Sequence, residues 1–272
     1  MTATNDSLNA ALNPRDGRAL LNSYDDAQTF YQQLENELVP KWEHLMSTRI
    51  FRALMGDEPV GVELLQLYLI ESYHYVKHNA QHQALAVWQK DVRDRDFMRA
   101  ALRHALEEVD HDQMALRDLE RMGIERERVI RSEPLAETMG FTGYLYYLVT
   151  RDNPVGRLGY SIWAEGTQKM GPVLINRIKN KYGIADDKKI SFFAAHATLD
   201  MKHGEECRRS IERFARTPED QYAVRVAAHT TLKLFINVLE AVYDRYLEVK
   251  AGASLLRELP AEVGVNSSGF RL

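Results

Sequence analysis

The stretch HATLDMKHGEEC, residues 196–207, decides how the rest of the chain is interpreted. An α-helix turns about 100° per residue, so His196, Asp200 and His203 fall within roughly 60° of one another on one helix face. Leu199 lies beside that face, which predicts that the face points inward. Three polar groups aimed into a core are costly unless they are paired or bind something. The alternative is an ordinary solvated His/Asp face.

The chain around this stretch is typical of one all-α domain. Its 272 residues are 45% hydrophobic and 27% charged, which is enough for a single core. An apolar period of 3.6 residues recurs along the chain, whereas sustained period-two alternation does not. We therefore expect seven helices, at roughly 26–47, 60–90, 95–122, 133–150, 155–181, 188–214 and 218–250. Residues 1–24 and 251–272 lack a sustained pattern, so we expect a flexible arm and a tail on either side of a helical domain of residues 25–250.

Two of these helix ends carry recognisable residues. Thr217 followed by Pro218 is typical of a helix cap with proline in the first helical position. Gly123 follows the run ALRDLERM, where a glycine would end the preceding helix.

Charge and composition disfavour several classes of partner. The net charge is −4 and no basic block stands out, so we expect no nucleic-acid partner. No apolar run is long enough for a membrane span, and no basic region followed by an apolar run begins the chain, so we expect neither a membrane partner nor a signal peptide. The single cysteine, Cys207, cannot form an internal disulfide, which fits a cytoplasmic protein.

Two other expected helices carry carboxylates near apolar residues. In HALEEVDHDQMALRDLERMG, residues 104–123, Glu108 precedes His111 by three positions and would share its helix face. This spacing is common on charged helix faces, and Glu107 offers a second carboxylate. Glu165 follows the apolar run Ile-Trp-Ala and precedes a glycine, and its alternative interpretation is a carboxylate at the edge of the core.

Together the three segments offer three carboxylates and three imidazoles. These are Glu108, His111, Glu165, His196, Asp200 and His203. Hard oxygen ligands combined with imidazole suit iron or manganese, whereas structural zinc favours thiolates. Helical bundles hold carboxylate-bridged pairs of such metals between facing helices, so the set indicates a metal site inside the bundle.

The order Glu-x-x-His, then a lone Glu, then His-x-x-x-Asp-x-x-His resembles the haem-oxygenase-like di-iron oxidases and oxygenases. The resemblance extends over residues 26–250 and is strongest to the branch of alkene-forming fatty-acid decarboxylases. It implies a haem-oxygenase-like bundle, two Fe2+ ions and O2 as co-substrate. It also implies that the six carboxylate and imidazole residues named above are the metal ligands.

Some features depart from the family pattern and keep alternatives open. In several members the first carboxylate lies seven or more residues before the His, a position that His104 occupies here. A self-consuming p-aminobenzoate branch has a lysine ten residues after the middle Glu, where this chain has Ile175. Relatives of the thiaminase II and quinone-cofactor-synthase type work without metal, so a metal-free oxidase or accessory protein remains an alternative. A true haem oxygenase would need His44 as its ligand, and we find no reason to make Cys207 a nucleophile.

The segment YLIESYHYVKHNAQHQALAVW, residues 68–88, is rich in His and Tyr. We expect part of it to form a polar wall of the substrate pocket, through Tyr73, His74, Lys77 and His78. Such a wall favours a small amine- or amino-acid-like substrate that undergoes N-oxygenation or oxidative C–C cleavage. The alternative interpretation is that this segment faces solvent or a partner subunit. The alternative substrate is a fatty acid. We also expect a homodimer and an external electron donor.

Overall fold

The computed structural model describes residues 27–88, 94–166, 171–186 and 190–258, without the side chains of residues 27–28 and 196–203. Within that part the regular elements are helices, which confirms the all-α prediction, and β-pairing is limited to one isolated bridge between Ser132 and Glu258. The helices are α3 (Ala27–Met46), α4 (Arg49–Met55), α5 (Val62–Val76), α6 (Asn79–Leu85), α7 (Arg95–Glu107), α8 (His111–Arg121), α9 (Arg126–Arg131), α10 (Ala136–Arg151), α11 (Arg157–Ala164), α12 (Gly171–Tyr182), α13 (Ser191–Phe214) and α14 (Pro218–Lys250), with a 3₁₀ turn at Pro154–Gly156.

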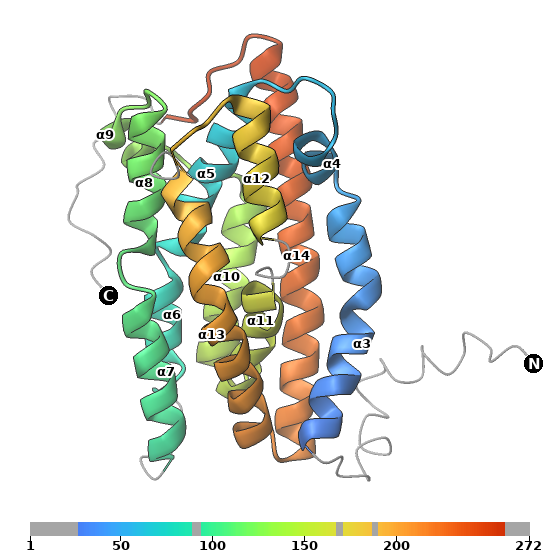
Figure 1. Cartoon of the computed structure of the whole chain (residues 1–272). Helices are drawn as coiled ribbons and strands as arrows, with labels where there is room; N and C mark the ends of the chain where they lie inside the picture. Colours follow the sequence, from blue (N-terminus) through green and yellow to red (C-terminus); the bar gives the residue numbers. More distant parts are fainter. Residues whose placement is uncertain (1–26, 89–93, 167–170, 187–189, 259–272) are drawn as a thin grey trace, which may run out of the picture.

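The 33-residue helix α14 runs through the length of the bundle and packs against α3, α5, α10 and α11 (Figure 1). Its first turn confirms the cap prediction, because the Thr217 hydroxyl oxygen accepts the N–H of Asp220 at 3.1 Å and Pro218 is the first helical residue. The glycine prediction is confirmed as well. Gly123 has φ +86° and follows α8, and the N–H of Ile124 donates to the carbonyl of Leu119, as in a Schellman motif.

Three of the expected helices are interrupted. The segment 60–90 divides into α5 and α6 at Lys77 and His78, and the segment 95–122 divides into α7 and α8. The segment 155–181 holds two separate helices, because α11 ends at Ala164 and α12 begins at Gly171. The break between α7 and α8 is at Asp110, which has φ +73° in the left-handed region that aspartate tolerates better than most residues. Apolar periodicity continued through these breaks, so it could not reveal them. The short helices α4 and α9 were not predicted either.

Helices α11 and α14 approach each other very closely. A Cβ added to Gly159 of α11 would lie 2.1 Å from the carbonyl oxygen of Val224 and 2.6 Å from the backbone nitrogen of Ala228. Only a glycine permits this contact. The contact fixes α11, and therefore the residue that follows it, Glu165, relative to the longest helix of the bundle.

None of the described helices combines the length and the apolar character that crossing a membrane requires.

Candidate metal centre

A half-buried imidazole lies between two buried carboxylates. His104 Nε2 is 3.5 Å from Glu108 Oε1 and 3.4 Å from Glu165 Oε1. Glu108 and Glu165 are only 8% and 9% exposed. One potential ligand atom from each residue lies within 4.8 Å of the others, so the three could hold one metal ion.

Helix ends position this group. His104 and Glu108 are one turn apart at the C-terminal end of α7, where Glu108 is the capping residue. Glu165 is the capping residue of α11. The C-terminal ends of α7 and α11 therefore meet at this site.

His111 also joins the group, by a route that differs from the predicted one. Its Nδ1 atom is 3.2 Å from Glu108 Oε2. The two residues do not share a continuous helix face, because the chain leaves the helix at Asp110 and α8 begins at His111. The prediction that they lie together is therefore met through the turn between α7 and α8.

The electrostatics of the group suit a bound cation. Burial alone would lower the pKa of His104, but hydrogen bonds and charges of the two carboxylates outweigh it and raise the pKa to about 9. Burial alone would raise the pKa of Glu108, but hydrogen bonds with His104 and His111 keep it well below its usual range. In this arrangement the imidazolium of His104 balances the carboxylates, and a metal ion could take the place of its proton. Two carboxylates and imidazole form a donor set that fits iron.

The other predicted ligands lie on α13. His196, Asp200 and His203 belong to this helix, but their side chains lie outside the described residues, so their part in the site stays a prediction. Helix α13 packs against α8, which begins at His111, and against α11, which Glu165 follows.

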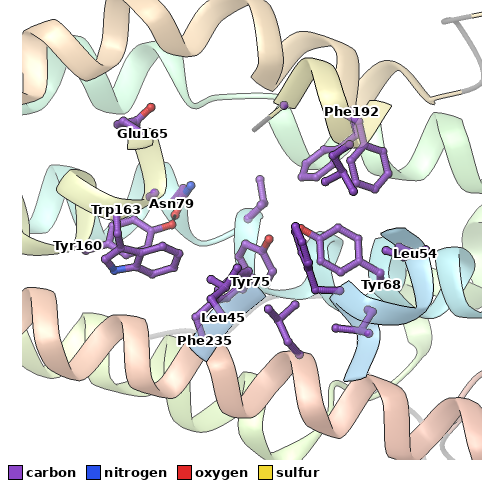
Figure 2. A pocket seen from close by; sticks show the side chains of 18 of the residues that line it. Leu45, Leu54, Tyr68, Tyr75, Asn79, Tyr160, Trp163, Glu165, Phe192 and Phe235 are labelled. Carbon is purple, nitrogen blue, oxygen red and sulfur yellow. Dashed lines mark hydrogen bonds between the residues drawn. The ribbon is translucent and has the colours of Figure 1, made fainter. Parts of the chain in front are cut away.

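A largely apolar cavity of about 190 Å³ extends from the carboxylates into the bundle. Figure 2 shows Glu165 and Asn79 at one end, and Tyr68, Leu54 and Phe192 towards the other. Glu108 also lines the cavity, and the remaining wall is mainly aromatic and aliphatic. The cavity offers a slim apolar space that ends at the candidate metal ligands.

The predicted polar pocket wall is not found at this cavity. The residues predicted for that wall, none of which lines the cavity, are Tyr73, His74, Lys77 and His78. Helix α5 instead presents Tyr68, Tyr75 and Val76. His74 bonds to Ser132 at 3.0 Å and to Lys77 at 3.2 Å, so its polar atoms are satisfied by neighbouring structure and not by a ligand. His78 likewise contacts a tyrosine of α10.

A second, more polar hollow of about 350 Å³ reaches His104 from between α7 and α13. Glu107, the other candidate for the first carboxylate ligand, lines this hollow, whereas Glu108 lies beside His104 and Glu165. The geometry therefore favours Glu108 over Glu107. Cys207 lies in the same wall, and burial raises the pKa of its thiol. A protonated thiol is a poor nucleophile, and the sequence likewise offers no reason to make Cys207 a nucleophile.

Several residues of the site escaped the sequence analysis. His104 was noted only for its spacing, although its position four residues before Glu108 already places it one helical turn away. Asn79, His82 and Arg157 were not considered. Of these three, Asn79 bonds to Glu108, and it does so at the first residue of α6, a helix start that no spacing rule reveals.

Known proteins resemble this chain along most of its length. Residues 66–235 match a family described as iron-containing redox enzymes. A solved domain of unknown function with a haem-oxygenase-like fold, from Shewanella denitrificans, is 31% identical with a TM-score of 0.78, over 82% of this chain and 96% of that domain. A TenA homologue of Pseudomonas syringae pv. tomato has a TM-score of 0.66 at 15% identity, over 79% of this chain and 93% of the homologue.

A shorter match concerns a 4-aminobenzoate synthase of Nitrosomonas europaea, which is 31% identical over 74 residues. That match spans 27% of this chain and 30% of the synthase, so this chain matches less than a third of its length. The family match, in contrast, covers more than half of this chain and includes His104, Glu108, His111, Glu165 and the α13 motif. The chain therefore belongs to the family of iron-containing redox enzymes and has the haem-oxygenase-like fold.

Proposed function

We propose that this chain is a non-haem iron oxidase or oxygenase that uses O2 and holds two Fe2+ ions. The observation that carries the proposal is the group of His104 and the two buried carboxylates Glu108 and Glu165, which line the end of an apolar cavity. Burying two carboxylates beside one imidazole is costly without a compensating cation, and this donor set suits iron.

The ligands of the proposed site come from both halves of the chain. His104, Glu108 and Glu165 supply one group, with His111 next to Glu108. The predicted ligands His196, Asp200 and His203 would complete the set from α13. Bound iron would supply the activation of O2. The protein residues would hold the metal, orient the substrate and exclude water from the apolar cavity.

The cavity changes the substrate that we favour. Its apolar walls suit a molecule with an alkyl or aromatic body whose reactive end reaches the carboxylates. Its volume is below the ~300–1,000 Å³ typical of ligand pockets, which favours a slim molecule. We therefore propose an apolar-bodied substrate, such as a fatty acid undergoing oxidative decarboxylation. The small amine- or amino-acid-like substrate becomes the second candidate.

The resemblance to 4-aminobenzoate synthase does not lead us to propose that activity. The lysine expected for that branch is replaced by Ile175, which lines the cavity. An apolar side chain at this place instead fits the apolar substrate class.

Iron content tests the metal site directly. We expect about two irons per chain after anaerobic loading with Fe2+, and a loss of most of that iron in Glu108→Gln. Glu37→Gln is a matched control, because Glu37 also contacts a histidine, His229 at 3.3 Å, but at the surface. A wild-type protein that binds no iron would favour the metal-free alternative.

Oxygen uptake tests the substrate class. The iron-loaded protein with a reductant should consume O2 faster with saturated carboxylic acids than with amino acids or guanidines. Mass spectrometry of the products would identify the reaction. A response confined to amino acids or guanidines would restore the small polar substrate.

A further inference from the structure

A chain of four buried polar side chains ends on Glu108. Arg157 Nε donates to His82 Nδ1 at 3.2 Å, and His82 Nε2 is 3.1 Å from Asn79 Oδ1. Asn79 Nδ2 in turn donates to Glu108 Oε2 at 3.0 Å. All four side chains are at most 8% exposed, so water does not compete for these bonds. This row of hydrogen bonds joins α11, α6 and the end of α7.

The direction of every bond in this chain follows from Arg157. A guanidinium can only donate, so His82 Nδ1 must accept and the ring hydrogen must lie on Nε2. That hydrogen is donated to Asn79 Oδ1, to which Tyr160 also donates its hydroxyl hydrogen at 3.4 Å. With its oxygen held on that side, the Asn79 amide has only its NH2 group to present to Glu108.

Arg157 is itself held firmly. Nη1 donates to the Ser161 hydroxyl at 2.7 Å, and the guanidinium lies 4.3 Å from the ring centre of Tyr160. A buried cation without a directly bonded carboxylate is expensive. Tyr160, Glu108 and Glu165 are close enough to favour its charge and so offset part of this cost.

We propose that Arg157, His82 and Asn79 are positioning residues that fix the rotation of the Glu108 carboxylate. Asn79 bonds to Oε2, which leaves Oε1 turned towards His104 and Glu165. The inference rests on the proposed iron site, for which it names the residues that orient one ligand. Partners that orient metal ligands typically change metal affinity by about 10–100-fold when removed.

The test compares variants near to and far from Glu108. Asn79→Asp replaces the NH2 donor by a carboxylate that faces Glu108. Arg157→Met removes the donor that sets the His82 tautomer, although Arg157 forms no hydrogen bond with Glu108. We expect each to weaken Fe2+ binding, measured by competition with a chelator, by about 10–100-fold. Arg157→Lys keeps a donor and a charge and should recover part of the loss.

Thr231→Val is the matched control. It removes another fully buried hydrogen bond, from Trp163 Nε1 at 2.8 Å, without touching Glu108. We expect its Fe2+ affinity to stay within about threefold of the wild type. The absorption bands of bound Co2+, which report ligand geometry, should shift in Asn79→Asp and Arg157→Met but not in Thr231→Val.

Wild-type Fe2+ affinity and unchanged Co2+ bands in both Asn79→Asp and Arg157→Met would overturn the inference and leave the proposed function intact. Should Arg157→Met fail to fold, Asn79→Asp and Arg157→Lys decide the same question. If the wild-type protein binds no iron, the proposed function fails. The crystal structure of metal-free Asn79→Ala then decides the positioning role: Glu108 turned away from His104 supports it, and Glu108 unmoved overturns it.

Discussion

Asp118 of α8 caps the first turn of α13 by accepting the backbone N–H of Phe192 at 2.8 Å on Oδ2. Its other oxygen accepts the hydroxyl hydrogen of Ser191 at 2.7 Å. Asp118 is fully buried, and α13 has no capping side chain of its own. The contact therefore ties the helix that carries His111 to the helix that carries the three remaining predicted ligands.

Replacing Asp118 should loosen this connection. Asp118→Ala leaves a buried N–H and a hydroxyl without their acceptor, at a cost of about 1–3 kcal/mol in the free energy of unfolding. Urea unfolding measures that loss, and iron affinity should fall with it if α13 supplies ligands. Glu120→Ala, on the exposed face of the same helix, is the control and should change stability by less than about 0.5 kcal/mol. Equal stability of the two variants would show that the cap is unimportant.

Gly159→Ala should push α11 away from α14. The added methyl group would meet two backbone atoms at 2.1 and 2.6 Å, and backbone cannot rotate aside as a side chain can. We expect a destabilisation of about 1–3 kcal/mol, together with weaker iron binding because Glu165 follows the same helix. Gly143→Ala is the matched control in α10, where an added Cβ meets nothing within 4 Å. Relief of the glycine penalty should stabilise that variant by about 0.5–1 kcal/mol. An unfolding curve for Gly159→Ala that matches the wild type would contradict the close approach.

These contacts show why the fold was more predictable than the site. Apolar periodicity located the long helical segments but not the short helices, and the residues at Thr217 and Gly123 marked real helix ends. Apolar periodicity could not locate the break at Asp110, because a left-handed residue leaves the apolar pattern on either side intact. Glu108 lies at the end of α7, just before that break, and Asn79 lies at the start of α6, just after the preceding break.

The residues predicted for the pocket wall lie away from the apolar cavity for a related reason. Residues 68–88 are rich in His and Tyr, but composition does not say which side of a helix meets a cavity. Tyr68 and Tyr75 face it, whereas His74 is held by the Ser132 hydroxyl. A bond between residues 58 positions apart cannot be inferred from spacing within one helix.

His74 should make the stability of the protein depend on pH. Burial, followed by the charge of Lys77, lowers its pKa from 6.5 to about 3. The unfolded chain therefore binds a proton below about pH 6.5 that the folded protein does not bind until about pH 3. The contribution of neutral His74 to the free energy of unfolding is therefore fully present above about pH 6.5. It falls as the pH drops from about 6.5 to about 3, by up to ~1.4 kcal/mol per pH unit.

The variant His74→Gln isolates this contribution, because glutamine can still donate to Ser132 and accept from Lys77 but does not titrate. Between pH 7.5 and 5.0 the wild type should lose about 2 kcal/mol more than the variant. Urea unfolding at the two pH values measures the difference. Parallel losses in both proteins would mean that His74 is not kept neutral by the fold.

The far end of the apolar cavity should set the length of the substrate. Leu54 lies there, away from Glu165 (Figure 2), and is 5% exposed. Leu54→Phe shortens the cavity at a tolerable cost of about 1–3 kcal/mol in stability. Calorimetric titration with saturated carboxylic acids of increasing chain length should show weaker binding of the longest acids by about tenfold or more, with shorter acids unaffected. Leu102→Phe, at a leucine on α7 that is 48% exposed, should leave the whole series unchanged. Iron content should be the same in both variants, because Leu54 lies at the far end of the cavity from Glu165 and Leu102 is exposed. An identical chain-length profile for Leu54→Phe and the wild type would show that the substrate does not occupy this cavity.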